Sequence, residues 1–548
     1  MIKHTLHSIA FPVLDSDQIA QIANCTTVVS KHCRDGETLV AVGDRSFKFF
    51  IVKSGEIEIL DYSGDVPKTI ATHRRGEFTG DISHLTGTPA VFTATVRGDC
   101  EVFEISGEAL RHVLNQCPGL GDVILQAFVA RRQLLRESPN FIGLRVIGSR
   151  YSADTFRVRD FLARNRMLFT WTDLETDPQV DRLLKDFGVT EADTPVVACA
   201  HMLLLRNPSN ERLADAVGIH QALEHTVFDL LVVGAGPAGL AAAVYGASEG
   251  LKTAVLDCSA PGGQAGSSMR IENYLGFPTG LTGAELTDRA TLQANKFGAH
   301  LSIPTAATRL SFENGYASLY AGGTEPITAK CLLIATGAQY RKLEVEGVDR
   351  FEGRGVYYAA TPAEALFCRG CPAIVVGSGN SAGQAAVFLA GHASRVLLLI
   401  RGDDLNKNMS SYLVNRIEQT ANIELLCNTT IWQMVGNSHL EAIEIVSCAR
   451  ARRTVETPAV FSFIGATPRT EWLPPEIERD SKGFVQTGAA VARSPHWGAA
   501  RAPFLLETSC RGVFAAGDVR SGSVKRVASA VGEGAMAVQF VHEYLKEM

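Results

Sequence analysis

The stretch FDLLVVGAGPAGL, residues 228–240, decides the fold of most of this chain. An apolar run is followed by GxGxxG and by small residues suited to a packed helix. In a strand, turn and helix of this kind, Gly234 allows the tight bend, Gly236 lets the backbone approach a pyrophosphate, and Gly239 lets the helix pack on the strand. The next apolar run ends in Asp257, an acid that can bind ribose hydroxyls. The pattern predicts a βαβ unit that binds a dinucleotide.

A second turn of the same kind occurs in AIVVGSGNSA, residues 373–382, before the helical text GQAAVFLAG. Two dinucleotides are therefore expected. The strand after this helix, SRVLLLI, is followed by Arg401 instead of an acid, which favours a 2′-phosphate and hence NADPH over NADH. Because Asp403 and Asp404 lie close by, an ordinary surface arginine is the alternative interpretation.

The composition indicates an ordinary globular protein of several domains. At 548 residues, three to five domains are expected. With 46% hydrophobic residues and a net charge of -6, nothing favours nucleic acid or an anionic membrane as a partner. The N-terminus lacks a signal-peptide pattern, and the uncharged run 230–248 contains four glycines and a proline. The twelve cysteines then suggest reduced thiols, and we expect a cytoplasmic protein with no membrane span and no metal site.

The text from Gly36, GETLVAVGDRSFKFFIVKSGEIEILDYSGD, alternates apolar and polar residues as a small antiparallel β-roll would. Over residues 10–137 it resembles the cyclic-nucleotide-binding family, whose phosphate-binding cassette corresponds to residues 74–96. Asp81 can bind the ribose hydroxyl, but residues 90–92 are Ala-Val-Phe where an arginine should neutralise the cyclic phosphate. We expect a degenerate nucleotide site in an interaction or regulatory module.

Residues 141–219 follow as a strand, a helix, a strand ending in Asp173, a helix, TPVV and a closing helix. This order resembles a thioredoxin or glutaredoxin fold, in which Thr194-Pro195 matches the family's cis-proline turn. At the helix N-terminus, where the family presents CxxC, residues 151–154 are Tyr-Ser-Ala-Asp. Because no thiolate can form there, we expect a docking or scaffold role, with Cys199 in the core.

Several short motifs then follow the first glycine turn in a fixed order. They are GGQA at 262–265, IENYLGFP at 271–278, IATGA at 334–338, FIGATPRT at 463–470 and GVFAAGDV at 512–519. In this order they resemble the low-molecular-weight thioredoxin reductase family, from Phe228 to the C-terminus. The resemblance implies two Rossmann-like α/β domains, for FAD and NADPH, after the all-β roll and the thioredoxin-like α/β domain. The expected boundaries are 1–137 for the β-roll, 138–222 for the thioredoxin-like domain, 226–345 with 470–548 for FAD, and 346–469 for NADPH.

The resemblance also assigns binding residues. Asp257 and the first turn would hold the ADP half of FAD, Gln264 and Asn273 would lie along the flavin, and Asp518 would bind the ribityl or phosphate region. The full FAD set is Gly234, Gly236, Pro237, Ala238, Gly239, Asp257, Gly263, Gln264, Asn273, Thr336, Gly337, Gly517, Asp518, Lys525, Arg526 and Val527. The NADPH set is Gly377, Gly379, Asn380, Ser381, Ala382, Arg401 and Gly465.

The family's redox dithiol stands a few residues after GV-x-Y, where this chain has Ala359 and Pro362. Cys368 and Cys371 come about nine residues later, which is roughly 14 Å if the intervening segment is helical. Transfer through a thiol needs near contact of about 3 to 3.5 Å. The CRGC pair therefore looks misplaced, and its two cysteines are the only catalytic candidates. Tyr357, Tyr358 and Thr361 would line the space that the missing dithiol leaves.

The sequence thus predicts a homodimeric NADPH-dependent flavoprotein oxidoreductase that passes electrons from FAD directly to an external acceptor. A quinone, a small disulfide, a ferredoxin-like protein and oxygen are the acceptors considered. Two alternatives stay open: a disulfide reductase that uses Cys368 and Cys371 or a partner's thiols, and a flavin-based redox sensor that signals through the N-terminal modules.

Overall fold

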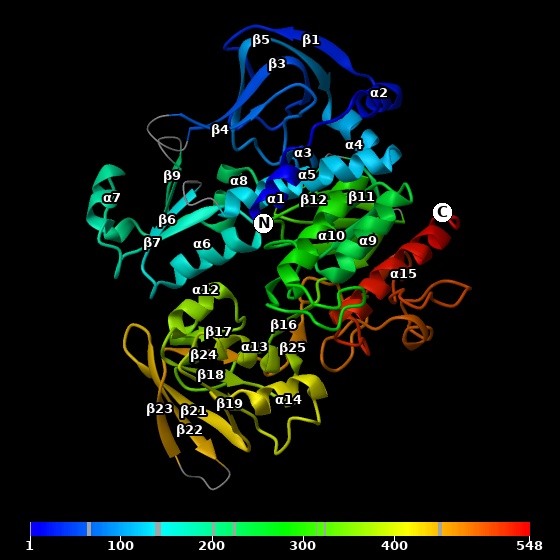
Figure 1. Ribbon diagram of the computed structural model, residues 1–548. Helices are drawn as coiled ribbons and strands as arrows, with labels where there is room; N and C mark the ends of the chain where they lie inside the picture. Colours follow the sequence, from blue (N-terminus) through cyan, green and yellow to red (C-terminus); the bar gives the residue numbers. More distant parts are fainter. Residues whose placement is uncertain are drawn as a thin grey trace.

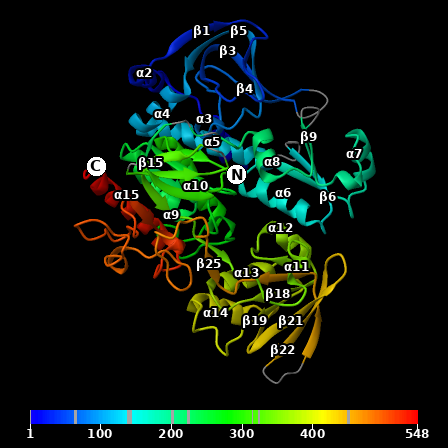
Figure 2. The ribbon, with the colours of Figure 1, turned by 180° about the vertical axis from the view of Figure 1, so that it is seen from behind.

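The computed structural model describes residues 2–62, 67–137, 144–199, 203–221, 223, 226–313, 315–322, 325–447 and 452–548. Figures 1 and 2 show four groups of elements, which we name by their residues. They are the β-roll (2–137), the small-sheet region (144–221), the first-turn region (226–345 with 470–548) and the second-turn region (346–469). Residues 138–143 and 222, where the expected thioredoxin-like segment begins and ends, lie outside the described residues.

The β-roll is a five-stranded antiparallel sheet in the order β1-β5-β3-β4, with β2 paired to β5. Side chains alternate along β3, so that Phe49 and Ile51 pack in one cluster and Phe50 and Val52 in another. Its elements are α1 Ile2–Ala10, α2 Ser16–Cys25, β1 Val29–Cys33, β2 Thr38–Val40, β3 Phe49–Asp61, β4 Lys68–His73, α3 Ser83–Thr86, β5 Thr93–Ile105, α4 Gly107–Gln116 and α5 Pro118–Glu137.

The small-sheet region has the strand order β7-β6-β8-β9, with β6 and β7 parallel and the other pairs antiparallel. Val146 and Ile147 of β6 face the clusters on opposite sides of this sheet. The Thr194-Pro195 peptide bond is cis. The elements are β6 Leu144–Gly148, α6 Ala153–Arg164, β7 Phe169–Asp173, α7 Val180–Asp186, β8 Val196–Cys199, β9 Leu203–Arg206 and α8 Asn210–Val217.

The first-turn region is built on a sheet in the order β12-β11-β10-β15-β14-β13, with β26 also paired to β15. Its parallel strands are buried on both faces, which explains the uninterrupted apolar run in β10. The elements are β10 Phe228–Val233, α9 Pro237–Ser248, β11 Thr253–Leu256, α10 Gly283–Phe297, β12 His300–Ser302, β13 Arg309–Glu313, β14 Tyr316–Tyr320, β15 Ile327–Ile334, β26 Val513–Ala515 and α15 Val527–Leu545.

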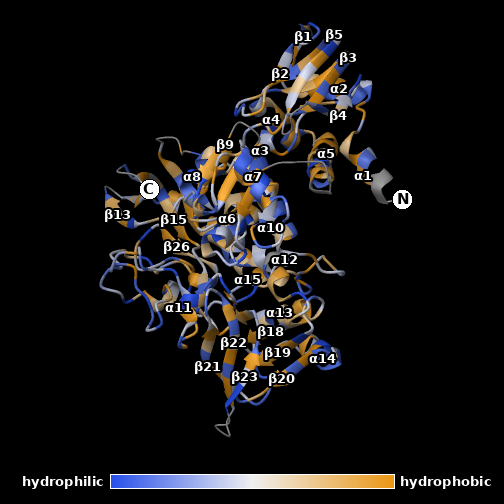
Figure 3. Cartoon of the chain, turned by 90° about the vertical axis from the view of Figure 1, so that its left-hand side faces the viewer, coloured by the Kyte–Doolittle hydropathy of each residue, from blue (hydrophilic) through white to orange (hydrophobic). Residues whose placement is uncertain are grey.

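The second-turn region has a parallel sheet, β17-β24-β18-β19-β20, and an antiparallel sheet, β21-β22-β23. A short pair, β16 with β25, connects it to the first-turn region. Strands β18 and β19 are hydrophobic along most of their length (Figure 3). Strand β16, Ala338–Tyr340, lies in the first-turn region. The elements of the second-turn region are α11 Val348–Phe351, β17 Val356–Tyr357, α12 Pro362–Ala365, β18 Pro372–Val376, α13 Asn380–Ala390, β19 Arg395–Leu399, α14 Ser411–Gln419, β20 Ile423–Leu426, β21 Thr429–Gly436, β22 Leu440–Ser447, β23 Arg452–Glu456, β24 Ala459–Ser462 and β25 Ala466–Pro468.

The uncharged run 230–248 forms the end of β10, the glycine turn and α9. Within the described part of the chain, no helix has both the length and the apolar character needed to cross a membrane.

Candidate functional site

The first glycine turn joins β10 to α9, and its glycines pack closely against neighbouring backbone atoms. Gly234 has a φ of 110°, and a β-carbon on it would lie 2.3 Å from the carbonyl oxygen of Ala335. A β-carbon on Gly239 would lie 1.8 Å from the oxygen of Gly234. Gly236 faces the backbone of Gly263 with no side chain between them. The chain therefore excludes side chains at Gly234 and Gly239, and it leaves space in front of Gly236, where a pyrophosphate would approach.

Helices α9, α13 and α15 begin without a side-chain cap, as do α14 and the shorter α3, α7 and α11. In contrast, α2, α4, α6, α8 and α10 are each capped by an Asp, Ser or Thr side chain. The first N–H groups of a helix need acceptors, and with the helix dipole they form a ready anion site. Helices α9 and α13 follow the two glycine turns, and α15 begins at Val527 after Arg526. These uncapped ends fit the phosphates of two dinucleotides.

Asp257 directly follows β11 and braces the loop after it. Its carboxylate accepts hydrogen bonds from the backbone N–H groups of Ala235 (2.9 Å), Ser259 (2.9 Å) and Ala260 (3.1 Å). A carboxylate accepts about four hydrogen bonds, so most of this capacity is used within the chain. The position agrees with a ribose contact, but bracing of the first turn is the role that its hydrogen bonds display.

The other predicted FAD residues gather around the same loops. Gln264 donates to the oxygen of Ala338, and the hydroxyl of Thr336 donates to the oxygen of Arg469 at 2.9 Å. Gly337 follows Thr336 with a φ of 65°. Asn273 is exposed in a loop and has no hydrogen-bond partner among the described residues.

Asp518 lies in a partly buried polar cluster ahead of α15. Burial raises the pKa of Asp518, and burial lowers the pKa of Lys525. Lys525 donates to the backbone oxygen of Asp518 at 2.6 Å, while Gly517 donates its N–H to Glu533 at 2.7 Å. Burial with Asp518 nearby also raises the pKa of Tyr340.

The second glycine turn lies close to this cluster. The hydroxyl of Tyr340 donates to that of Ser381 at 3.3 Å, so a residue of β16 that the sequence motifs did not single out joins the first-turn region to the second turn. Its position directly after IATGA was the available signal. Gly377 has a φ of 141° and would place a β-carbon 2.4 Å from the oxygen of Phe463, whereas Gly379 faces open space.

The remaining predicted NADPH residues differ in whether their polar groups already form hydrogen bonds within the protein. The amide of Asn380 pairs with Ser410, Ala382 is buried, and the oxygen of Gly465 accepts from the N–H of Arg341 at 2.9 Å. Arg401, two residues beyond the end of β19, is exposed.

The acids near Arg401 are occupied by other groups. Asp403 pairs with Lys407 at 2.6 Å, and Asp404 accepts from the N–H of Asn406 at 2.9 Å. Arg401 has no ion pair or hydrogen bond within the described residues. Its guanidinium is therefore available to a ligand.

The CRGC pair is divided between the interior and the surface. Cys368 is buried, donates its thiol to the oxygen of Ala365 at 3.5 Å, and has its pKa raised by burial to about 11. Cys371 is exposed, and both thiols are free. Of the two positions expected to carry the dithiol, Ala359 is half-buried and Pro362 is exposed at the start of α12.

The residues expected around the missing dithiol mostly make contacts within the chain itself. Tyr357 is 3% exposed and stacks on Phe367 with ring centroids 5.4 Å apart. Tyr358 donates to Glu352 at 2.9 Å, and the N–H of Thr361 donates to Glu364 at 2.7 Å.

In the β-roll, the cassette-like segment lies against the end of the small-sheet region. A β-carbon on Gly218 would lie 2.1 Å from Pro89, and the side chain of Gln221 donates to the oxygen of Thr86. The backbone oxygen of Gln221 accepts from Ser302 of β12 at 2.8 Å. One residue thus connects the cassette with the first-turn sheet.

In and beside the cassette, the polar groups that could contact a nucleotide form hydrogen bonds within the protein instead. Asp81 accepts from the N–H of Ser83 at 2.9 Å. The buried guanidinium of Arg131 donates to the oxygens of Phe78 (2.9 Å) and Gly80 (2.5 Å). These contacts agree with a degenerate nucleotide site.

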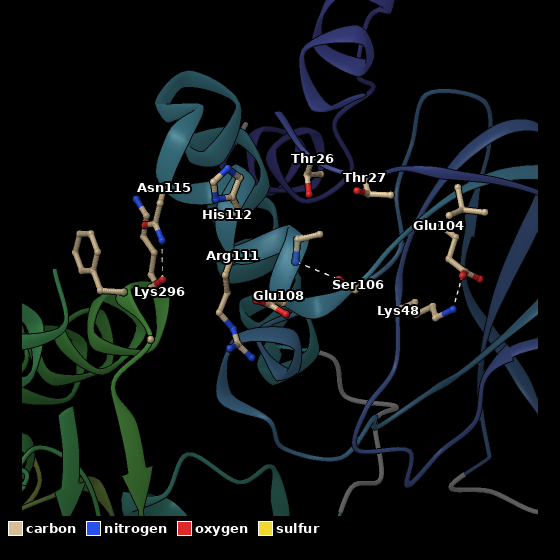
Figure 4. A pocket seen from close by; sticks show the side chains of 14 residues that line it. Thr26, Thr27, Lys48, Glu104, Ser106, Glu108, Arg111, His112, Asn115 and Lys296 are labelled. Carbon is tan, nitrogen blue, oxygen red and sulfur yellow. Dashed lines mark hydrogen bonds and ion pairs between the residues drawn. The ribbon is translucent and has the colours of Figure 1, made fainter. Parts of the chain in front are cut away.

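A cavity of about 580 Å³ lies between α4 of the β-roll and the C-terminal end of α10 (Figure 4). The amide of Asn115 crosses it to the oxygen of Lys296 at 3.1 Å, and Arg111 has a buried Nε without a hydrogen-bond partner. None of the predicted FAD or NADPH residues lines it.

Comparison with known proteins agrees with this geometry. The family described as Pyridine nucleotide-disulphide oxidoreductase matches residues 228–534, and the Cyclic nucleotide-binding domain matches residues 30–117. The chain belongs to the pyridine nucleotide-disulphide oxidoreductases.

Within this class it resembles the thioredoxin reductases. It is 31% identical to thioredoxin reductase of Bacillus subtilis, over 59% of this chain and 97% of that protein. It is 32% identical to thioredoxin reductase of Treponema pallidum, over 58% and 98% of the two chains. The crystal structure of Lactococcus lactis thioredoxin reductase aligns with a TM-score of 0.53 at 26% identity, over 59% of this chain and all of that one.

These similarities confirm the predicted resemblance to the low-molecular-weight thioredoxin reductase family, with a cyclic-nucleotide-binding-like domain at the N-terminus. The protein is an NAD(P)H-dependent flavoprotein oxidoreductase with a Rossmann-type fold of the thioredoxin reductase kind.

Proposed function

We propose that the protein oxidises NADPH and delivers the electrons from FAD directly to an external acceptor, without a protein dithiol. The observation that carries this proposal is that both glycine turns are closed at a glycine that admits no side chain, Gly239 in the first and Gly377 in the second, while the family's cysteine positions hold Ala359 and Pro362. The overall reaction is NADPH plus a proton plus an oxidised two-electron acceptor, giving NADP⁺ and the reduced acceptor.

Bound FAD would supply an isoalloxazine ring that takes up a hydride equivalent from nicotinamide. The chain would bind the FAD pyrophosphate at Gly236 and the N-terminus of α9, with the uncapped N-terminus of α15 directed at the flavin half. Asp518 and Lys525 would hold the region between them. Arg401 would pair with the 2′-phosphate of NADPH, and Tyr340 with Ser381 would hold the two binding sites side by side.

Anaerobic stopped-flow reduction tests the proposal. We expect NADPH to bleach the oxidised flavin of the purified protein, and NADH to bleach it more slowly. If neither nucleotide reduces the flavin, the proposal is wrong.

A disulfide reductase that uses Cys368 and Cys371 is the second candidate, because the relatives are named thioredoxin reductases and Cys371 is exposed. We place it second because the thiol of Cys368 is buried and its pKa is raised to about 11. Turnover of a disulfide substrate that disappears on replacing either cysteine by serine would reverse this order.

We further propose that the small-sheet region is a thioredoxin-like domain without redox cysteines, that the β-roll is a regulatory module, and that the boundaries predicted from the sequence divide the chain. The homodimer and the cytoplasmic location stay predictions.

A further inference from the structure

Helix α6 of the small-sheet region packs on the second-turn region beside the expected dithiol positions. A β-carbon on Gly353 would lie 3.4 Å from the Cβ of Ala153 in the first turn of α6. The ring of Tyr151, just before the helix, stacks on His439 at 4.1 Å, and Phe156 lies 5.5 Å from Tyr357. Both views of the ribbon show α6 next to α12 (Figures 1 and 2).

Two buried charged side chains lie on the two sides of the same contact. Arg159 of α6 is 6% exposed and lies 3.5 Å over the ring of Trp171, and Glu364 of α12 is 2% exposed. Burial lowers the pKa of Arg159, and the nearby charge of Glu364 opposes that shift. Burial also raises the pKa of Glu364. Separating the two surfaces would remove the nearby Glu364 charge that stabilises the buried Arg159 cation, which is costly for a buried ion.

The other end of α6 is fastened to the first-turn region. Asn165 donates to the backbone oxygen of Ser259 at 2.9 Å, and Arg166 pairs with Asp288 at 2.5 Å. Arg164 reaches the oxygen of Gly263, which faces the first glycine turn, at 3.5 Å. The helix therefore spans both nucleotide-binding regions and holds them in one arrangement.

We propose that α6 is a fixed cover over the acceptor side of the reductase, so that the electron acceptor is a small molecule and not a folded protein. This rests on the proposed function. A stable protein partner needs about 800 Å² of surface on each side. Around Tyr357 and Gly353 that surface is taken by Phe156 and Ala153, and Tyr151 covers His439. The exposed Pro362 and half-buried Ala359 leave access for a small molecule.

A quinone illustrates the chemistry. The hydride of NADPH supplies two electrons and a proton, a second proton comes from solvent, and the quinone leaves as the hydroquinone. Nothing in this balance requires the chain to be oxidised or reduced overall.

Locking the cover tests whether turnover needs it to move. The β-carbons of Ala153→Cys and Gly353→Cys would lie at a separation close to the roughly 3.5 to 4.5 Å that a disulfide bridges. We expect the oxidised double variant to reduce p-benzoquinone with NADPH within about two-fold of its reduced, desalted form. A loss of about ten-fold or more on oxidation would overturn the proposal. Ala153→Cys alone, oxidised in the same way, is the control.

Opening the cover is the complementary test, and it does not depend on Gly353 accepting a side chain. Phe156→Asp places a charge against Tyr357, and we expect faster hydrogen exchange at residues 356–368. Cytochrome c, which takes one electron per molecule and two molecules per NADPH, should be reduced about ten-fold faster than by wild type, with the benzoquinone rate unchanged. Arg182→Ala, on an 85% exposed side chain of α7, is the matched control.

The outcomes separate the two proposals. A wild-type protein whose flavin NADPH cannot bleach would defeat the proposed function, whatever the exchange data show. A wild-type protein that NADPH does reduce, but that reduces cytochrome c as fast as benzoquinone or leaves residues 356–368 unprotected from exchange, would defeat only the small-molecule inference.

Discussion

Two stretches of the second-turn region, only a few residues apart, differ in what they leave open. The glycine turn at residues 377–382 keeps an uncapped helix end, and Arg401 beside it has no partner within the described residues. The segment 356–368, where the family's electrons would leave, has Tyr357, Glu364 and Cys368 buried under or beside α6. The difference indicates that the chain keeps an open site for the electron donor and restricts the site for the acceptor.

The largest effect should come from breaking the first glycine turn, which would hold the flavin between donor and acceptor, at its tightest point. Gly239→Ala puts a methyl group 1.8 Å from the oxygen of Gly234, and overpacking of this kind costs about 3 kcal/mol or more. We expect a protein that does not retain flavin, measured as the ratio of flavin to protein absorbance.

Gly379→Ala is the matched control for that substitution, since a β-carbon there meets nothing within 4 Å. Its flavin content should equal that of wild type. Equal flavin in Gly239→Ala and wild type would contradict the view that the first turn excludes side chains.

On the acceptor side, the two thiols should differ greatly in reactivity. Because burial raises the pKa of Cys368 to about 11, only about one molecule in a thousand carries the thiolate at pH 8. Alkylation with iodoacetamide, followed by peptide mass spectrometry, should therefore modify Cys371 and spare Cys368. Labelling of Cys368 should increase with each unit of pH toward 11; similar labelling of both at pH 8 would show that the segment is open.

The preference for NADPH over NADH tests whether Arg401 belongs to the binding site of the electron donor. Arg401→Ala should raise the KM for NADPH by about 10- to 100-fold, the value of a charge-assisted hydrogen bond, and leave the KM for NADH unchanged. Steady-state kinetics with both nucleotides measure this. Lys407→Ala, which removes a neighbouring cation already paired with Asp403, should change neither value. A parallel rise for NADH would mean that Arg401 does not contact the 2′-phosphate.

The smallest effect is expected from the cysteines themselves. Cys368→Ser with Cys371→Ser should keep NADPH-quinone turnover within about two-fold of wild type, because neither thiol takes part in the proposed route. A collapse of turnover would favour the disulfide reductase instead.

The sequence was most informative where the structure is local. Glycines at fixed spacing, an apolar strand before them and small residues after them depend on contacts within about twenty residues, as at Gly234 and Gly377. Even there the strands end early: β11 stops one residue before Asp257, and β19 two residues before Arg401. The short distance from each strand end keeps both side chains at the expected edge of the sheet.

What the sequence could not predict are contacts between distant segments. Nothing in the sequence around Arg159 indicates that Glu364 lies near it, and nothing around Gly218 indicates its contact with Pro89. These pairs depend on how four packed regions meet, which is set by the sum of many side-chain shapes and not by a repeating pattern. The tyrosine link from Tyr340 to Ser381 was missed for the same reason.

The connection at Gln221 has a consequence for how this protein could have been assembled in evolution. Its side chain holds the β-roll and its backbone holds Ser302, while Leu292 of α10 packs into the core of the β-roll. The N-terminal regions thus share hydrogen bonds and hydrophobic contacts with the reductase, and they contribute to its stability. Cutting the chain before residue 226 would expose Leu292 to water and remove the hydrogen bond from Ser302 to Gln221, so the remaining reductase would carry an exposed apolar surface on α10.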